Sequence, residues 1–182
     1  MKQSIRIIGG KYRSKKLYFP SLDGLRPTPD RVRETLFNWL MYDIHNARCI
    51  DAFAGSGALG FEAFSRGAAH VTLVEAQPAA FKNLHQTALN FNAPNLKVIH
   101  VDARAFLQNI QEPVDIIFLD PPFASSYLAE CLQIIAQGHC LSSKGLVYIE
   151  SAKEIILDPL LWFERKSSKA GQVYYALYEK RT

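Results

Sequence analysis

From Cys49 to the C-terminus, strand-like and helix-like segments alternate along this chain of 182 residues. Short runs of Val, Ile and Leu predict buried strands, and longer segments with apolar residues three and four apart predict helices. This alternation predicts an α/β fold, a doubly wound and mostly parallel sheet with helices on both faces. The expected strands are 49–53, 70–75, 96–101, 114–119 and 145–150, and the expected helices are 58–65, 79–90, 103–110 and 127–137.

The two ends of the chain depart from this alternation. Residues 162–169 and 173–180 predict a closing antiparallel hairpin, joined at Ala170-Gly171-Gln172. Residues 5–8 and 11–19 flank Gly9-Gly10 and predict a small N-terminal hairpin. A loop rich in Pro follows, and a helix is expected to begin near Asp30. We expect one domain over residues 1–182, with a hairpin extension (1–24) and a core (25–182).

A glycine-rich segment, Gly55 to Gly60, directly follows the first core strand and opens the first core helix. It matches the pattern G-x-G-x-x-G, whose glycines allow a tight turn and a close approach of a ligand to the backbone. Glu75 ends the next strand, where an acidic side chain can accept hydrogen bonds from both ribose hydroxyls. The pattern alone is compatible with a dinucleotide or with S-adenosylmethionine.

Acidic residues end four successive core strands, and they favour a cationic cofactor. Asp51, Glu75, Asp102 and Asp120 would repel the pyrophosphate of a dinucleotide, whereas a sulfonium and an ammonium group tolerate them. Each carboxylate taken singly is also compatible with a helix cap or a solvated turn. The expected cofactor-binding residues are Asp51, Ala54, Gly55, Ser56, Gly57, Glu75, Ala76, Asp102, Ala103 and Asp120.

The segment Asp120-Pro121-Pro122-Phe123 follows the apolar strand 114–119, at the sheet edge where α/β proteins bind ligands. The two prolines remove backbone donors and hold the chain extended, so nearby carbonyls are expected to stay free as acceptors. Acceptors beside the aromatic ring suit a planar base with an exocyclic amine. Asp120, Pro121, Pro122 and Phe123 are therefore the expected catalytic residues, the alternative being a proline-rich turn without function.

Positive charge is concentrated near the N-terminus. Residues 1–48 carry ten Lys and Arg against four Asp and Glu (10 − 4 = +6), and the remainder carries 11 against 13 (−2). This asymmetry predicts a polyanion partner, although a solvated charged face would have the same composition. The residues expected to bind such a polyanion, which the resemblance given below implies to be RNA, are Lys11, Tyr12, Arg13, Lys15, Lys16, Arg26 and Arg31.

The remaining composition excludes several classes of protein. No apolar run reaches the length of a membrane span, and the N-terminus has no signal-peptide pattern. Three cysteines without metal-ligand spacing are expected to be reduced thiols, and no metal site is predicted. Reduced cysteines predict a cytoplasmic protein. We expect a monomer, since no separate interface segment stands out.

These motifs together resemble the S-adenosylmethionine-dependent methyltransferases, and more narrowly the bacterial small-subunit (16S) ribosomal RNA guanine-N2 methyltransferase family. The selective parts are I-R-I-I-G-G-K-Y-R, L-R-P-T-P-D-R-V-R-E-T-L-F-N-W-L, D-A-F-A-G-S-G-A-L-G and D-P-P-F. Family members often carry a second Thr where this chain has Pro29. The resemblance covers nearly the whole chain and implies a seven-stranded class I methyltransferase sheet with a reversed last strand.

The resemblance also implies a function. The chain is expected to methylate the exocyclic N2 amine of a guanine in ribosomal RNA or a small-subunit particle, with S-adenosylmethionine as cofactor. Three alternative functions share part of this pattern. A DNA or other-RNA amino-methyltransferase would share D-P-P-aromatic, and an NAD-dependent oxidoreductase would share the glycine pattern. An RNA-binding module without enzymatic activity would share the basic segment. The polar residues Arg26, Thr28, Arg31, Arg33 and Glu34 suggest the rim of the cofactor and substrate cleft, with a structural salt bridge as the alternative for Arg33 and Glu34.

Overall fold

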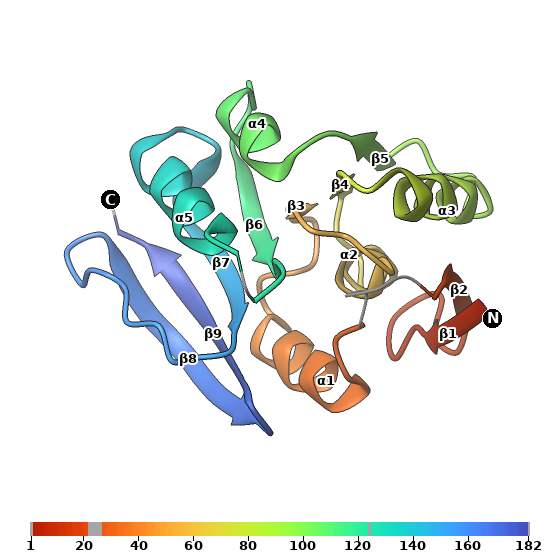
Figure 1. Ribbon diagram of the computed structural model, residues 1–182, viewed down its shortest axis with the longest axis horizontal. Helices are drawn as coiled ribbons and strands as arrows, with labels where there is room; N and C mark the ends of the chain where they lie inside the picture. The colour runs from red at the N-terminus through yellow and green to blue at the C-terminus, as the bar shows by residue number, and fades with distance from the viewer. Residues whose placement is uncertain (1, 22–26, 124, 182) are drawn as a thin grey trace.

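A seven-stranded sheet forms the centre of the computed structural model, which describes residues 2–21, 27–123 and 125–181 (Figure 1). Its order is β5-β4-β3-β6-β7-β9-β8. Strands β3 to β7 pair in parallel, and β9 runs antiparallel to both β7 and β8. The predicted sheet with a reversed last strand is confirmed. The strands are β3 (Arg48–Asp51), β4 (His70–Glu75), β5 (Leu96–His100), β6 (Val114–Leu119), β7 (Leu141–Ser151), β8 (Trp162–Ala170) and β9 (Val173–Lys180).

Helices cover both faces of the sheet, and each face has its own hydrophobic core (Figure 1). Leu36, Phe61 and Leu84 place α1, α2 and α3 over one face. Leu107 and Ile135 place α4 and α5 over the other. This division confirms the predicted two-sided α/β arrangement. The helices are α1 (Asp30–Trp39), α2 (Ala58–Ser65), α3 (Pro78–Leu89), α4 (Ala103–Gln108) and α5 (Tyr127–Gln137).

The N-terminal hairpin is present, but both strands are shifted from those predicted, and the second is shorter. Strands β1 (Lys2–Arg6) and β2 (Lys16–Pro20) pair antiparallel. Residues 11–14 form turns instead of continuing β2, because the Lys11 amide donates to the Ser65 carbonyl of α2 rather than to a strand partner. The first core strand likewise ends at Asp51 instead of Phe53, where the glycine-rich turn begins.

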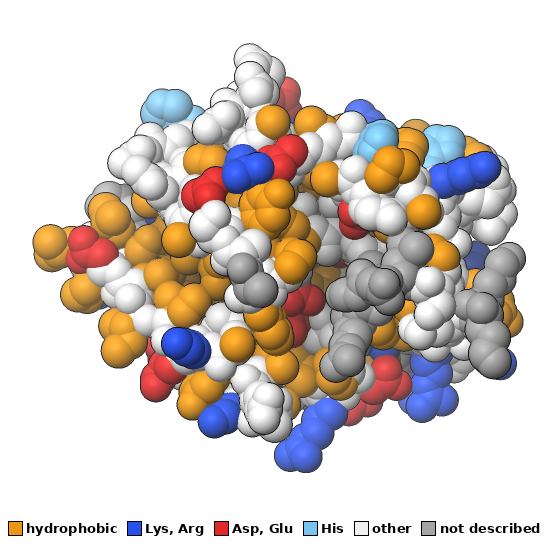
Figure 2. All heavy atoms as spheres, in the orientation of Figure 1, with side chains coloured by type: hydrophobic (Ala, Val, Ile, Leu, Met, Phe, Trp, Pro, Cys, Tyr) orange, Lys and Arg blue, Asp and Glu red, His pale blue; other side chains and the backbone are white. Residues whose placement is uncertain are grey.

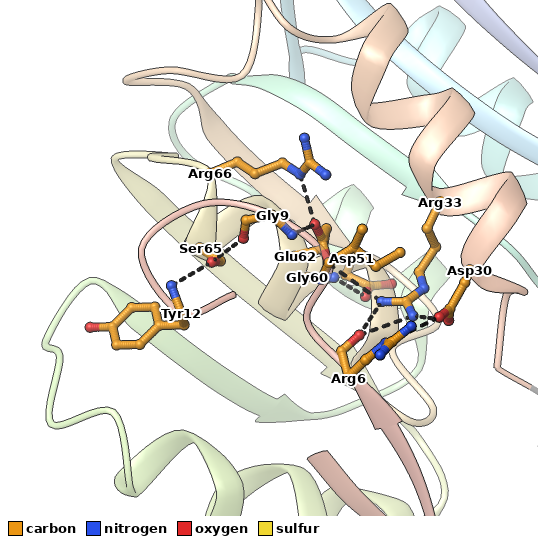
Figure 3. Close-up of polar contacts among 11 residues, drawn as sticks. Arg6, Gly9, Tyr12, Asp30, Arg33, Asp51, Gly60, Glu62, Ser65 and Arg66 are labelled. Carbon is orange, nitrogen blue, oxygen red and sulfur yellow. Dashed lines mark hydrogen bonds and ion pairs between the residues drawn. The ribbon is translucent and has the colours of Figure 1, made fainter. Parts of the chain in front are cut away.

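A buried polar network holds the hairpin against α1 and α2 (Figure 3). The Glu62 carboxylate accepts hydrogen bonds from the amides of Ile8 (2.8 Å) and Gly9 (2.9 Å). It also pairs with Arg66 (2.7 Å) and with the fully buried Arg33 (3.4 Å). Arg33 donates further to the Arg6 carbonyl and to Asp30, so one guanidinium joins three segments of the chain. Arg33 is therefore structural and does not line the cleft.

Candidate active site

A cavity of about 620 Å³ lies at the carboxyl ends of β3, β4 and β6, where parallel α/β sheets bind ligands. Figure 2 shows acidic side chains at the bottom of a hollow with hydrophobic side chains beside it. All ten predicted cofactor-binding residues except Gly57 line this cavity, and so do the four predicted catalytic residues. The lining includes Thr28, Asp51, Ala54, Gly55, Ser56, Glu75, Ala76, Asp102, Ala103, Asp120, Pro121, Pro122, Phe123 and Tyr127.

The glycine-rich turn requires its glycines for two different reasons. Gly57 has φ +80°, and a Cβ there would lie 2.3 Å from the Phe61 ring. A larger residue is thus disfavoured both by backbone strain and by overlap. A Cβ on Gly60 would lie 3.0 Å from the Leu73 side chain and 3.1 Å from Asp51 Oδ2, so glycine lets α2 pack closely on the sheet. The Gly60 amide donates to Asp51 Oδ2 at 2.8 Å (Figure 3). The turn therefore leaves Gly55 and Ser56 at the cavity wall.

Asp51 is a buried carboxyl at the base of this turn, with 2% of its surface exposed. Burial raises the pKa of Asp51 to about 7, with a smaller raising contribution from Glu75 and an opposing hydrogen bond from Gly60. Among the described residues, no Lys or Arg forms an ion pair with Asp51. A bound cation would therefore find a carboxyl without an internal counter-ion.

Glu75 and Asp102 stand at the ends of β4 and of the segment after β5. Glu75 accepts from the amides of Gly55 (2.8 Å) and Gln77 (2.7 Å), which orient its carboxylate beside the glycine turn. Asp102 caps α4 through the Arg104 amide, and its two oxygens also pair with the Arg104 side chain. This pairing lowers the pKa of Asp102. Asp102 is thus a helix cap, one of the roles that a single carboxylate allowed, and both carboxylates line the cavity.

The Asp120-Pro121-Pro122-Phe123 segment leaves β6 at the cavity. Pro121 is buried, and Phe123 is half exposed, with its ring available at the cavity wall. The Pro122 carbonyl accepts from the Ser125 amide (3.1 Å) and hydroxyl (2.6 Å). The expectation that the carbonyls here stay free is therefore wrong for Pro122, because the chain turns back at Ser125. Asp120 remains the acceptor that faces the cavity.

Thr28 and Glu150 also belong to this site, and no sequence motif predicted a catalytic role for either residue. Thr28 Oγ1 lies 3.0 Å from Glu150 Oε1 and 3.5 Å from Asp120 Oδ2. Tyr148 donates to the same Glu150 oxygen at 2.9 Å. One signal could have identified Glu150, since it lies near the end of the fifth parallel strand, as the other acidic residues do in theirs.

The predicted RNA-binding residues divide into exposed and packed side chains. Lys11, Arg13, Lys16 and Arg31 are exposed, and Lys15 lies with its Nζ 4.0 Å from the centre of the Phe91 ring. The Tyr12 ring packs on Phe64 and Phe91 at the hydrophobic core. Tyr18 is 52% exposed on the same hairpin. Arg26 lies outside the described residues. Figure 2 shows Lys and Arg side chains along the lower rim of the face, over α1 and the hairpin.

The described residues contain no group of three or more His, Cys, Asp or Glu side chains that could hold a metal ion. Within the same ranges, no helix is both long and apolar enough to cross a membrane. All three cysteines are buried and none forms a disulfide.

The same arrangement of sheet and helices occurs in solved methyltransferase structures. A putative methyltransferase, yhhF, from Escherichia coli superposes with a TM-score of 0.89 at 43% identity, covering 99% of both chains. A putative methylase from Haemophilus influenzae, HI0767, gives 0.85 at 34% identity, covering 99% of this chain and all of the other. The fold and the strand-end cavity together thus define an α/β methyltransferase.

Sequence comparison narrows the class to a family. A family model described as "Conserved hypothetical protein 95" matches residues 5–179. The chain is 45% identical to "Ribosomal RNA small subunit methyltransferase D" of Escherichia coli strain K12, over 97% of this chain and 90% of the relative. The protein of the same name from Haemophilus influenzae is 39% identical over 98% and 95%. The chain therefore belongs to the family that this model and these ribosomal RNA methyltransferases represent.

Proposed function

We propose that this protein methylates the exocyclic N2 amine of a guanine in small-subunit ribosomal RNA, with S-adenosylmethionine as the methyl donor. The observation that carries the proposal is the single cavity in which the glycine turn, Asp51 and Glu75 lie together with Asp120 and Phe123. The part of the cavity suited to the cofactor is thus adjacent to the part suited to the target base. The names of the relatives, which specify ribosomal RNA of the small subunit, supply the substrate class.

The cavity fits S-adenosylmethionine in charge and in hydrogen-bonding groups. Asp51 would hold the ammonium group, and Glu75 has lone pairs left for ribose hydroxyls after accepting from Gly55 and Gln77. Ala103 and Asp102 would bind the adenine edge. The cofactor supplies an electrophilic methyl group on a cationic sulfur, and the acidic rim of the cavity stabilises that positive charge.

Asp120 and Phe123 would hold the target base. The lone pair of the guanine amine is delocalised into the ring, which makes it a poor nucleophile. Asp120 accepts a hydrogen bond from the amine and so favours a lone pair directed at the methyl group, while Phe123 stacks on the ring. Alignment of the reacting atoms then supplies most of the rate enhancement. The base must leave its stack to enter the cavity, which looped or single-stranded RNA allows at lower cost.

The exposed basic residues of the hairpin and α1 would position the RNA through its phosphates. Lys11, Arg13, Lys16 and Arg31 have exposed side chains that can contact the backbone without reading sequence. Tyr18, exposed between them, is the aromatic side chain of the hairpin best placed to stack on a base. Tyr12 is used instead to fasten the hairpin.

Methylation of RNA from cells that lack this protein tests the proposal. The purified protein should transfer radiolabelled methyl from S-adenosylmethionine to small-subunit RNA, free or in assembled particles, and nucleoside analysis should identify N2-methylguanosine. RNA from cells that contain the protein is the matched control and should take up little label, because its target is already modified. Label on another base, or on DNA alone, would contradict the proposed substrate.

A further inference from the structure

Behind Asp120 lies a second carboxyl group that the proposed chemistry does not use. Glu150 of β7 is 3% exposed and does not line the cavity, so it does not contact a bound base. Thr28, which does line the cavity, connects it to Asp120 through contacts of 3.0 Å and 3.5 Å. Residues 28, 120 and 150 are far apart in the sequence and come from three different segments, and only the fold brings them together.

The hydrogen-bonding capacity of Thr28 gives this contact a direction. A hydroxyl has one proton and two lone pairs, so Thr28 can donate to only one carboxylate at a time. The shorter contact is to Glu150, which leaves the Thr28 oxygen to accept from Asp120 whenever Asp120 carries a proton. Tyr148 donates to the same Glu150 oxygen and orients it. The groups form an unbroken chain from the cavity to the sheet interior.

The titratable groups that influence Asp120 and Glu150 are acidic or neutral. Asp51 of β3 acts on Asp120, Tyr148 of β7 donates to Glu150, and Tyr175 of β9 pairs in register with Glu150. Within the described ranges, neither Asp120 nor Glu150 forms an ion pair with Lys or Arg. Two buried carboxylates this close interact unfavourably when both are ionised, so they favour taking up a proton.

We propose that Thr28 joins Asp120 and Glu150 into one proton-accepting unit, which takes the proton that the amine releases on methylation. The inference rests on the proposed function. Asp120 Oδ2 accepts the proton from nitrogen, Thr28 Oγ1 accepts it from Asp120, and Thr28 gives its own proton to Glu150 Oε1. The sum is one proton moved from nitrogen to Glu150, with no oxidation or reduction, and it returns to water before the next turnover. Thr28 and Glu150 act through Asp120 and are positioning residues.

The acid–base behaviour of the cluster agrees with this assignment. Burial raises the pKa of Asp120 well above its ordinary value, and the neighbouring Glu150 raises it further. Burial also raises the pKa of Glu150, against the hydrogen bonds from Tyr148 and Thr28. A carboxylate with a raised pKa is a better proton acceptor near neutral pH than a solvated one.

Four variants test the unit by single-turnover methylation across a pH series. Thr28→Val removes the hydroxyl, Thr28→Ser restores it, and Glu150→Gln removes the second acceptor while keeping its shape. Tyr178→Phe is the matched control, because it deletes partly buried hydrogen bonds to Ile155 and Glu164 away from the cavity. We expect Thr28→Val and Glu150→Gln to lower the limiting rate by roughly 10-fold or more. Thr28→Ser and Tyr178→Phe should stay near the wild-type rate.

The pH profiles separate this role from a merely structural one. Glu150→Gln removes a neighbouring charge, so the midpoint of the rate should move to lower pH. Thr28→Val removes the hydrogen bond that Thr28 donates to Glu150 and that lowers the pKa of Glu150, so the midpoint of this variant should move to higher pH. Unchanged rates and midpoints in both variants, or a Thr28→Ser variant as slow as Thr28→Val, would overturn the proposal.

A measurement on the ligand-free protein tests the shared proton separately from methyl transfer. Infrared titration of the ligand-free protein should show coupled carboxyl steps that collapse to a single step at lower pH in Glu150→Gln. Wild-type and Glu150→Gln titrations that coincide would refute the shared proton even if a variant were too unstable to assay. If wild-type protein methylates no small-subunit RNA while the coupled steps are seen, the proposed function fails and the shared proton stands.

Discussion

At the scale of single residues, the strand-end carboxylates have divided roles. Asp51, Glu75 and Asp120 all lie at the cavity, yet each contacts different groups: the Gly60 amide, the Gly55 and Gln77 amides, and the Thr28 hydroxyl. These contacts determine which lone pairs remain for a ligand. Changes at each carboxylate should therefore affect different measurable quantities.

Glu75→Ala should weaken S-adenosylmethionine binding with little direct effect on the transfer step. Loss of charge-assisted hydrogen bonds to the ribose costs about 2–3 kcal/mol, or roughly 30–150-fold in dissociation constant. Isothermal titration calorimetry provides the measurement. Glu75→Gln is the matched control, because it keeps an oxygen acceptor and should lose less affinity. An unchanged affinity in Glu75→Ala would remove Glu75 from the cofactor site.

Asp120→Asn should largely preserve the fold and cofactor affinity while slowing methyl transfer. An amide keeps the shape of the side chain but cannot take a proton, and a positioned acceptor is worth roughly 10²–10³ in rate by analogy with oxyanion-hole groups. Stopped assays with saturating cofactor and RNA measure the effect. Wild-type turnover in this variant would exclude Asp120 from the chemistry.

At the scale of elements, the hairpin combines an exposed basic side with a buried attachment. Leu17 and Phe19 of β2 are buried, whereas Lys16 and Tyr18, which alternate with them along the strand, are exposed. This alternation places basic groups outward and fastens the strand inward. Its two sides should therefore respond to different substitutions.

Replacing Lys11, Arg13 and Lys16 together by Gln should weaken RNA binding and reduce its salt dependence. Three lost phosphate contacts predict that the slope of log K against log salt falls by roughly 2–3. Filter binding over a salt series measures the slope, and calorimetry should show unchanged S-adenosylmethionine affinity. An unchanged slope would show that the hairpin is a solvated face and that the RNA binds elsewhere.

Glu62→Gln should loosen the hairpin from α2. The carboxylate joins Arg33, Arg66 and two hairpin amides, and removing one charge of a buried pair costs about 3–5 kcal/mol. Hydrogen exchange should show lost protection at Ile8 and Gly9 in particular. A uniform loss across the protein would instead indicate that the network stabilises the fold as a whole.

At the scale of the whole molecule, the buried acidic cavity makes stability depend on pH. Asp51 has a pKa of about 7 in the folded protein and 3.8 as its ordinary value. An acid with a raised pKa contributes its full stability below about pH 4, and that stability is lost as pH rises to about 7. The shift corresponds to roughly 4 kcal/mol. Binding of a cation at Asp51 should recover part of it.

Urea unfolding of the ligand-free protein between pH 4 and 8 checks this dependence. Asp51→Asn should flatten the curve, because the amide does not ionise, and the difference from wild type isolates Asp51 from the other acids. Saturating S-adenosylmethionine should stabilise wild type most at the upper end of this range. Parallel curves for wild type and Asp51→Asn would contradict a buried, titrating Asp51.

The sequence by itself determined the sheet, its reversed last strand and most of the cavity wall. Parallel strands bring their carboxyl ends to one edge, so motifs at those ends converge whatever the side-chain packing. The tertiary structure alone decided the rest. It packed Tyr12 inward, buried Arg33 against Glu62, engaged the Pro122 carbonyl and joined Thr28 to Glu150. The physical reason is that all but the local Pro122 contact form between segments distant in the sequence, and their partners depend on how the elements pack, which no local pattern of residues records.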